Sequence, residues 1–132
     1  MMTRVFADYK ADEYRIKPVG QQELANTIQR LLLSHHYPEV LVVDDDENYL
    51  ELIGQYLSEE SIQIRVARDG EEALRKIAEK KPNLLILDII MPKKDGFAVL
   101  DEIQKQADQD GIAIIMVTSK SLSKNESNLL KS

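Results

Sequence analysis

The chain has 132 residues, of which 43% are hydrophobic and 30% are charged, as expected for one domain with a single core. It contains no cysteine, which excludes a disulfide framework, a thiolate metal site and a cysteine nucleophile. The formal net charge of −6 repels nucleic acid and anionic lipid, and no cluster of basic residues is long enough to reverse this locally. We therefore expect no direct binding to nucleic acid or to a membrane.

The hydropathy of the chain indicates a cytoplasmic protein. No apolar run approaches the roughly 20 residues that are needed to span a bilayer. The N-terminus also lacks the apolar stretch of a secretory signal. The absence of cysteine is compatible with a reducing compartment.

From residue 40 onward, short apolar runs alternate with amphipathic stretches, which is typical of βα units around a parallel sheet. The expected elements are a strand over Val40–Val43, a helix over Asn48–Leu57, a strand over Ile62–Val66 and a helix from Asp69-Gly70 to Lys81-Pro82. The last of these helices stops there because the residue before a proline avoids helical geometry.

The second half of the chain continues this alternation. Leu84–Leu87 is continuously apolar, as expected of a central strand, and Asp88 stands at its C-terminal end. A helix between Gly96 and Gly111 and a strand over Ile112–Val117 follow. Beyond Thr118 there is only a short helix candidate, with no further strand.

The N-terminal segment offers the missing unit. It contains a strand candidate at Tyr14–Ile16, which Lys17-Pro18 terminates, and a helix over Gln21–Leu33. Residues 34–39 form a linker to the first strand of the main pattern. We therefore predict one α/β domain over residues 1–132, with five βα units and a doubly wound, five-stranded parallel sheet.

Three aspartates stand at the ends of predicted strands: Asp44 and Asp45 after the first, and Asp88 after the third. In an open parallel sheet, ligands bind beyond the carboxyl ends of the strands where the strand order reverses, so these acids converge. Clustered carboxylates require a neutralising cation, and oxygen ligands favour a hard ion such as Mg²⁺ that also accepts phosphate oxygens. This pattern predicts a site for phosphate.

In such a site a carboxylate oxygen attacks a phosphoryl donor and forms an acyl phosphate, a role that we assign to Asp88. The charge on the transferring oxygens needs a lysine, a hydroxyl or backbone N–H groups to stabilise it. Thr118 at the end of the fourth strand and Lys17 at the end of the N-terminal strand are the candidates.

These motifs together resemble the response regulator receiver domain (CheY-like) of two-component signalling. LVVDDDE at 41–47 is similar to the acidic pair of the family, LLILDIIMPKKDG at 84–96 to its phosphoacceptor loop, and IIMVTS at 114–119 to its hydroxyl-bearing strand. DEYRIKPV at 12–19 resembles the final strand and loop of the family, but it precedes the acidic pair.

The resemblance implies a role for each matching position. Asp44 and Asp45 would bind Mg²⁺ or Mn²⁺ together with Asp88 and the backbone carbonyl of Ile90. Asp88 would be phosphorylated, and Thr118 and Lys17 would contact the phosphoryl group. Tyr14 would be the switch aromatic, and Ile90 and Lys120 would tune dephosphorylation.

The displaced segment suggests a circular permutation of the flavodoxin-like fold, whose strand order is 2-1-3-4-5. Residues 1–33 would correspond to the last strand and helix of the family, and residues 40–132 to its first four units. The linker at 34–39 can span roughly 20 Å, enough to join them. A fragment of a tandem receiver protein is the other explanation, and a strand-exchanged dimer would complete the sheet as well as a monomer does.

The function implied is that of a phosphoacceptor switch rather than an enzyme in the ordinary sense. A sensor histidine kinase or a phosphotransfer protein would supply the phosphoryl group, and a downstream protein partner would recognise the altered face. Two alternatives stay open: a pseudo-receiver that only binds protein, and an aspartyl-phosphate phosphohydrolase. The phosphohydrolase would need an aspartate two residues after Asp88, where Ile90 stands.

Overall fold

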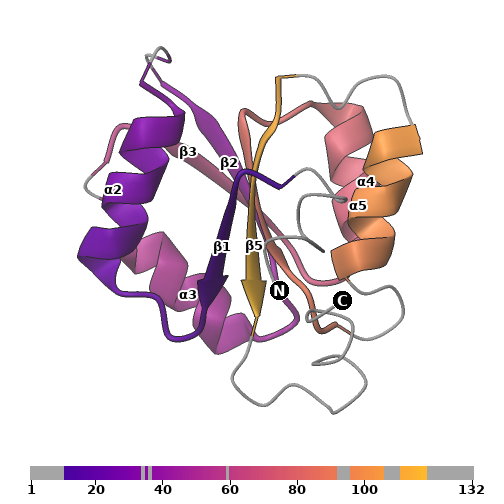
Figure 1. The fold of residues 1–132 in the computed structure, drawn as a ribbon, viewed down its shortest axis with the longest axis horizontal. Coiled ribbons are helices and arrows are strands. Elements are labelled where there is room, and N and C mark those ends of the chain that lie inside the picture. Colours follow the sequence, from indigo (N-terminus) through magenta and orange to yellow (C-terminus); the bar gives the residue numbers. More distant parts are fainter. Residues whose placement is uncertain are drawn as a thin grey trace.

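The computed structural model describes residues 11–33, 35, 37–58, 60–91, 96–105 and 111–118. A parallel sheet lies between two pairs of helices, with α2 and α3 on one face and α4 and α5 on the other (Figure 1). The elements are β1 (Glu13–Ile16), α2 (Gln21–Leu31), β2 (Glu39–Val43), α3 (Glu47–Tyr56), β3 (Gln63–Ala67), α4 (Gly70–Glu79), β4 (Leu84–Asp88), α5 (Gly96–Lys105) and β5 (Ala113–Thr118).

The five strands are ordered β1-β5-β4-β2-β3, and every pair is parallel. The prediction of an α/β fold with a five-stranded parallel sheet is therefore confirmed. The N-terminal strand lies at the edge beside β5, where Ile16 is in register with Thr118. The strand that precedes the acidic pair in the sequence thus pairs with the strand that ends at Thr118.

Alternation along the central strands builds two cores. On β4, Leu85 and Leu87 belong to the cluster beneath α4 and α5, whereas Leu84 and Ile86 belong to the cluster beneath α2 and α3. All four are fully buried, because successive side chains of a strand point to opposite faces. The continuous apolar run thus reflects a strand that is covered on both sides.

Two helices, α3 after β2 and α4 after β3, begin at aspartate caps. The side chain of Asp46 accepts a hydrogen bond from the Asn48 backbone N–H at 3.0 Å, and that of Asp69 accepts one from Glu72 at 2.8 Å. Such caps satisfy backbone donors that have no partner within the helix. Asp46 therefore has a structural role as a helix cap, whereas Asp44 and Asp45 are the acids of the predicted site.

Several boundaries differ from the prediction. Glu39, assigned to the linker, is the first residue of β2, where Asn83 Oδ1 accepts a hydrogen bond from its backbone N–H at 2.9 Å. The N-terminal helix ends at Leu31 rather than Leu33, whose side chain is exposed. The helix candidate after Thr118 lies outside the described residues, and so does Lys120.

None of the helices in the described ranges is both long enough and apolar enough to cross a bilayer.

Candidate functional site

The three aspartates singled out in the sequence converge beyond the carboxyl ends of β2 and β4. Carboxylate oxygens of Asp44, Asp45 and Asp88 all lie within 4.8 Å of one another. Asp44 and Asp88 are buried, whereas Asp45 is exposed at the rim. The cluster forms because β2 and β4 are adjacent and both end at this edge of the sheet.

Lys17 brings a positive charge to this cluster from the N-terminal strand. Its backbone N–H donates to the carbonyl oxygen of Thr118 at 2.8 Å, which continues the β1–β5 pairing by one residue. Its Nζ lies 2.7 Å from Asp44 Oδ2 and 3.7 Å from Asp88 Oδ2. The ammonium thus contacts both buried carboxylates.

Backbone amides hold the two buried carboxylates in place. Asp44 Oδ1 accepts a hydrogen bond from the N–H of Asp46 at 3.0 Å, and Asp88 Oδ1 accepts one from the N–H of Ile90 at 3.3 Å. In both cases the donor follows two residues later, so the turn after the strand folds back over its own aspartate. The carboxylate orientations are therefore set by local backbone geometry.

The charge balance of the cluster perturbs its titration. Burial first, and then the nearby charge of Asp44, raise the pKa of Asp88 to about 7 against the opposing effect of Lys17. Burial also raises the pKa of Asp44, and its hydrogen bond to Lys17 opposes this shift. Burial alone would lower the pKa of Lys17, but the bond to Asp44 and the charge of Asp88 outweigh it and raise the pKa. One ammonium thus only partly compensates the acidic cluster.

The donor set fits a hard divalent cation. Three carboxylates offer only oxygen ligands, and their oxygens are close enough together to contact one ion. The raised pKa of Asp88 has the same origin, because a buried carboxylate next to another carboxylate lacks a sufficient counter-charge. The residues that could hold the ion are Asp44, Asp45 and Asp88.

The structure also describes three other predicted site residues, each of which is at least partly buried. Thr118 is buried at the end of β5, the strand next to β4. Tyr14 is half-buried against the core beneath α4 and α5, and its hydroxyl donates to the carbonyl oxygen of Ala11 at 3.2 Å. The side chain of Ile90 packs against the same core.

Sequence reasoning gave no site role to two residues that adjoin the site. The face of Tyr49, in the first turn of α3, lies under the Lys17 ammonium, which is 4.2 Å from the ring centroid. Gly96 opens α5 so close to the end of β4 that a Cβ there would lie 2.7 Å from the Ile89 Cα. Tyr49 was detectable as an aromatic just after the acidic run, but its contact with Lys17 joins segments that are distant in sequence.

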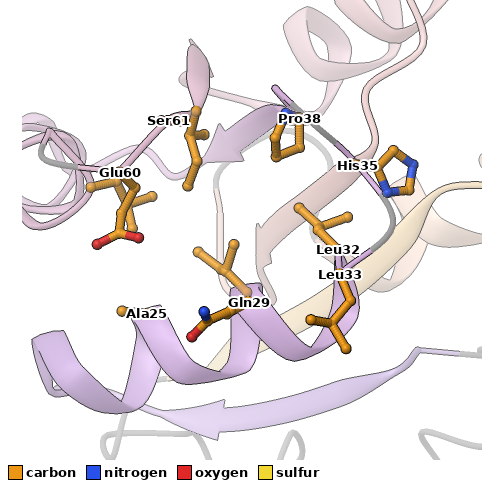
Figure 2. Close-up of a pocket in the computed structure, with 11 residues that line it drawn as sticks. Ala25, Gln29, Leu32, Leu33, His35, Pro38, Glu60 and Ser61 are labelled. Carbon is orange, nitrogen blue, oxygen red and sulfur yellow. The ribbon is translucent and has the colours of Figure 1, made fainter.

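A separate hollow of about 250 Å³ lies at the opposite ends of the strands (Figure 2). Its walls come from α2, the segment before β2 and the segment before β3, and they include Leu32, Pro38 and Ser61. No residue of the acidic cluster lines it. The hollow is therefore not part of the candidate site.

Comparison with known proteins identifies the class that this fold and site define. The family model of the response regulator receiver domain matches residues 40–132, and the chain belongs to this family. Receiver domains are the phosphoacceptor parts of response regulators in two-component systems, and phosphorylation on aspartate is typical of the family. The N-terminal segment that carries Lys17 lies outside the matched range.

Particular relatives support this assignment. The alkaline phosphatase synthesis transcriptional regulatory protein PhoP of Bacillus subtilis is 38% identical over 82 residues, which cover 62% of this chain and 33% of PhoP. Response regulator RR06 of Streptococcus pneumoniae is 42% identical over 69 residues, covering 52% of this chain and 32% of that protein. The chain thus spans about a third of the length of these curated relatives.

Solved structures show the same fold. The N-terminal domain of a response regulator receiver protein from Methanoculleus marisnigri has a TM-score of 0.61 at 30% identity, covering 70% of this chain and 76% of that one. Response regulator TrrA of Thermotoga maritima, solved in complex with Mg²⁺ and BeF, has a TM-score of 0.59 at 39% identity. That comparison covers 71% of this chain and 78% of the TrrA chain.

Proposed function

We propose that this chain is a phosphoacceptor switch in which Asp88 takes up a phosphoryl group in a Mg²⁺-dependent reaction. The observation that carries the proposal is the position of Lys17, whose Nζ lies 2.7 Å from Asp44 and 3.7 Å from Asp88. A cation-binding acid, a nucleophile and a phosphoryl-binding lysine thereby meet in one place.

In the proposed reaction, a carboxylate oxygen of Asp88 forms a bond to phosphorus as the bond from phosphorus to the donor's leaving group breaks. The product is an acyl phosphate on Asp88, and the leaving group departs with the bonding electrons. Asp44, Asp45, Asp88 and the carbonyl of Ile90 would hold Mg²⁺. The bound ion would supply counter-charge for the phosphoryl oxygens. Lys17 and Thr118 would contact the same oxygens.

We further propose that the signal leaves the site through Thr118 and Tyr14. Thr118 would turn toward the phosphoryl group, and Tyr14 would move into the space that it vacates. Because Tyr14 packs beside β5 against the core under α4 and α5, its movement would alter the face formed by β1 and β5. A downstream protein partner would recognise that face, while Ile90 and Lys120 would tune the lifetime of the phosphoryl group.

The order of the segments is explained in this proposal by a circular permutation. Residues 1–33 would supply the fifth strand and last helix of a receiver within the same chain, in a single domain. The parallel register of β1 with β5 and the contact of Lys17 with both buried acids support this arrangement. A histidine kinase or phosphotransfer protein is the proposed donor, in the cytoplasm, and the charge of −6 argues against direct contact of these residues with nucleic acid.

Incubation with acetyl phosphate and Mg²⁺, followed by intact-mass measurement, tests the proposal. We expect a single phosphoryl adduct on wild type. The adduct should not form when a chelator is present or in Asp88→Asn. Asp101→Asn is the matched control, since this carboxylate lies on the exposed surface of α5. A folded protein that takes up no phosphoryl group would instead favour a pseudo-receiver that acts only by binding protein.

A further inference from the structure

The contact between Lys17 and Tyr49 adds a residue to the machinery of the proposed reaction. The ammonium lies over the ring face at 4.2 Å from the centroid, within the range of a cation–π interaction. Tyr49 comes from α3 and Lys17 directly follows β1, so the contact joins two segments that are distant in sequence. The tyrosine is half-buried and packs against the core beneath α2 and α3.

A lysine needs such a support because its charge sits at the end of a flexible four-carbon chain. The side chain of Lys17 is only 21% exposed, and its ammonium contacts Asp44, Asp88 and the ring of Tyr49 among the described residues. Asp44 and Asp88 are both proposed ligands of the metal, and Asp88 is also the proposed nucleophile. Tyr49 is the member of this set whose contact with Lys17 does not depend on the state of a carboxylate.

We propose that Tyr49 is a positioning residue that holds the Lys17 ammonium beside Asp88 through the face of its ring. When a cation engages Asp44, the hydrogen bond from Lys17 to that carboxylate weakens, because both cations draw on the same charge. The ring still attracts the ammonium and keeps it within reach of a phosphoryl group on Asp88. This inference rests on the proposed function and assigns no role to the tyrosine hydroxyl.

Tyr49→Leu and Tyr49→Phe separate the ring from the hydroxyl. With acetyl phosphate and saturating Mg²⁺, we expect Tyr49→Leu to slow phosphoryl uptake by about threefold to tenfold, the size of a partly desolvated cation–π contact. Tyr49→Phe should stay within about twofold of wild type, because it keeps the aromatic face. Tyr56→Leu is the matched control, since Tyr56 lies on the same helix and packs against the same core.

A second readout follows the lysine itself. In the protein without phosphodonor, the Lys17 Hε protons should show an upfield ring-current shift in NMR spectra that is lost in Tyr49→Leu and kept in Tyr49→Phe. Equal rates in wild type and Tyr49→Leu would overturn the inference while leaving the phosphoacceptor function intact. Equal slowing in both Tyr49 variants would overturn it in favour of a role for the hydroxyl.

The outcome for wild type distinguishes the two proposals. If wild type takes up no phosphoryl group, the proposed function fails and the positioning role fails with it, even where the ring-current shift is present. If wild type is phosphorylated and Lys17 lacks the shift, only the positioning role is overturned.

Discussion

At the scale of single residues, the acidic cluster is a place where buried like charges reduce the stability of the fold. Asp44 and Asp88 are buried side by side, and among the described residues Lys17 is the cation paired with them. Burying two carboxylates is unfavourable unless counter-charge compensates both. The cluster should therefore respond strongly to protons and to added cations.

The titration of Asp88 leads to a pH dependence of stability in the metal-free protein. Its pKa is about 7 in the folded state, against about 3.9 in an unfolded chain. The folded state therefore binds the proton more tightly, so this contribution to stability is fully present below about pH 4 and is lost as the pH rises to about 7. We expect the free energy of unfolding of wild type to fall relative to Asp88→Asn by about 1 kcal/mol per pH unit across this window.

Urea unfolding in the presence of a chelator, at intervals from pH 5 to pH 8, measures this difference. Asn cannot ionise, so the difference between the two curves reports the titration of Asp88 together with its coupling to Asp44 and Lys17. Asp101→Asn should follow the wild-type curve, because its carboxylate is exposed on α5. Parallel curves for wild type and Asp88→Asn would show that the pKa of Asp88 is not raised by folding.

At the scale of elements, the loop between β4 and α5 depends on a residue without a side chain. The N–H of Gly96 donates to the carbonyl oxygen of Ile89 at 2.8 Å, which draws the start of α5 onto the end of β4. A Cβ at this position would meet the backbone of Asp88 and lie 2.7 Å from the Ile89 Cα. The nearest atoms belong to the backbone, so they cannot move aside as a flexible side chain could.

Gly96→Ala should therefore destabilise the protein by about 1–3 kcal/mol, the usual cost of overpacking. It should also reduce phosphoryl uptake, because the strain falls on the residue that carries the proposed nucleophile. Gly54→Ala, in the middle of α3, is the control. Apart from the chain neighbours and the backbone of α3 itself, no heavy atom of the described residues lies within 4 Å of the place that the new methyl group would take, and alanine favours the helix by up to about 1 kcal/mol. Urea unfolding of both variants checks the opposite signs, and an unchanged Gly96→Ala would contradict the close approach.

At the scale of the whole molecule, the site is assembled from strands that are far apart in the sequence. Lys17 comes from β1, Asp44 follows β2, and Asp88 and Thr118 end β4 and β5. Without β1 beside it, β5 would present an unpaired apolar edge, and the cluster would lose its lysine. The pairing of β1 with β5 thus completes the sheet and at the same time places Lys17 beside the acids.

Mixing two inactive variants tests whether one chain completes its own site. Lys17→Ala lacks the proposed phosphoryl-binding lysine, and Asp88→Asn lacks the proposed acceptor. If β1 pairs within its own chain, a mixture refolded together should show no more phosphoryl uptake than Lys17→Ala alone. Strand exchange would instead restore uptake in hetero-dimers, because a chain with intact Asp88 would receive an intact Lys17 from its neighbour.

The predictable part of the fold came from local patterns. The apolar run Leu84–Leu87 and the alternation around Ile64 identified strands, because burial on one or two faces leaves a direct trace in the order of side chains. Boundaries were less certain where tertiary contacts decided them. Glu39 looked like a linker residue, yet in the structure it begins β2 and lies 2.8 Å from the guanidinium of Arg65 and 3.1 Å from the ammonium of Lys80.

The sequence by itself determined the fold class and the convergence of Asp44, Asp45 and Asp88, because parallel strands bring their carboxyl ends to one edge of the sheet. Only the tertiary structure decided that Lys17 bonds directly to Asp44, that Tyr49 lies beneath its ammonium, and that Gly96 packs on the backbone of Asp88. These contacts join side chains and backbone from different elements at distances of a few ångströms. Such distances depend on how the layers pack, which periodicity along the chain does not encode.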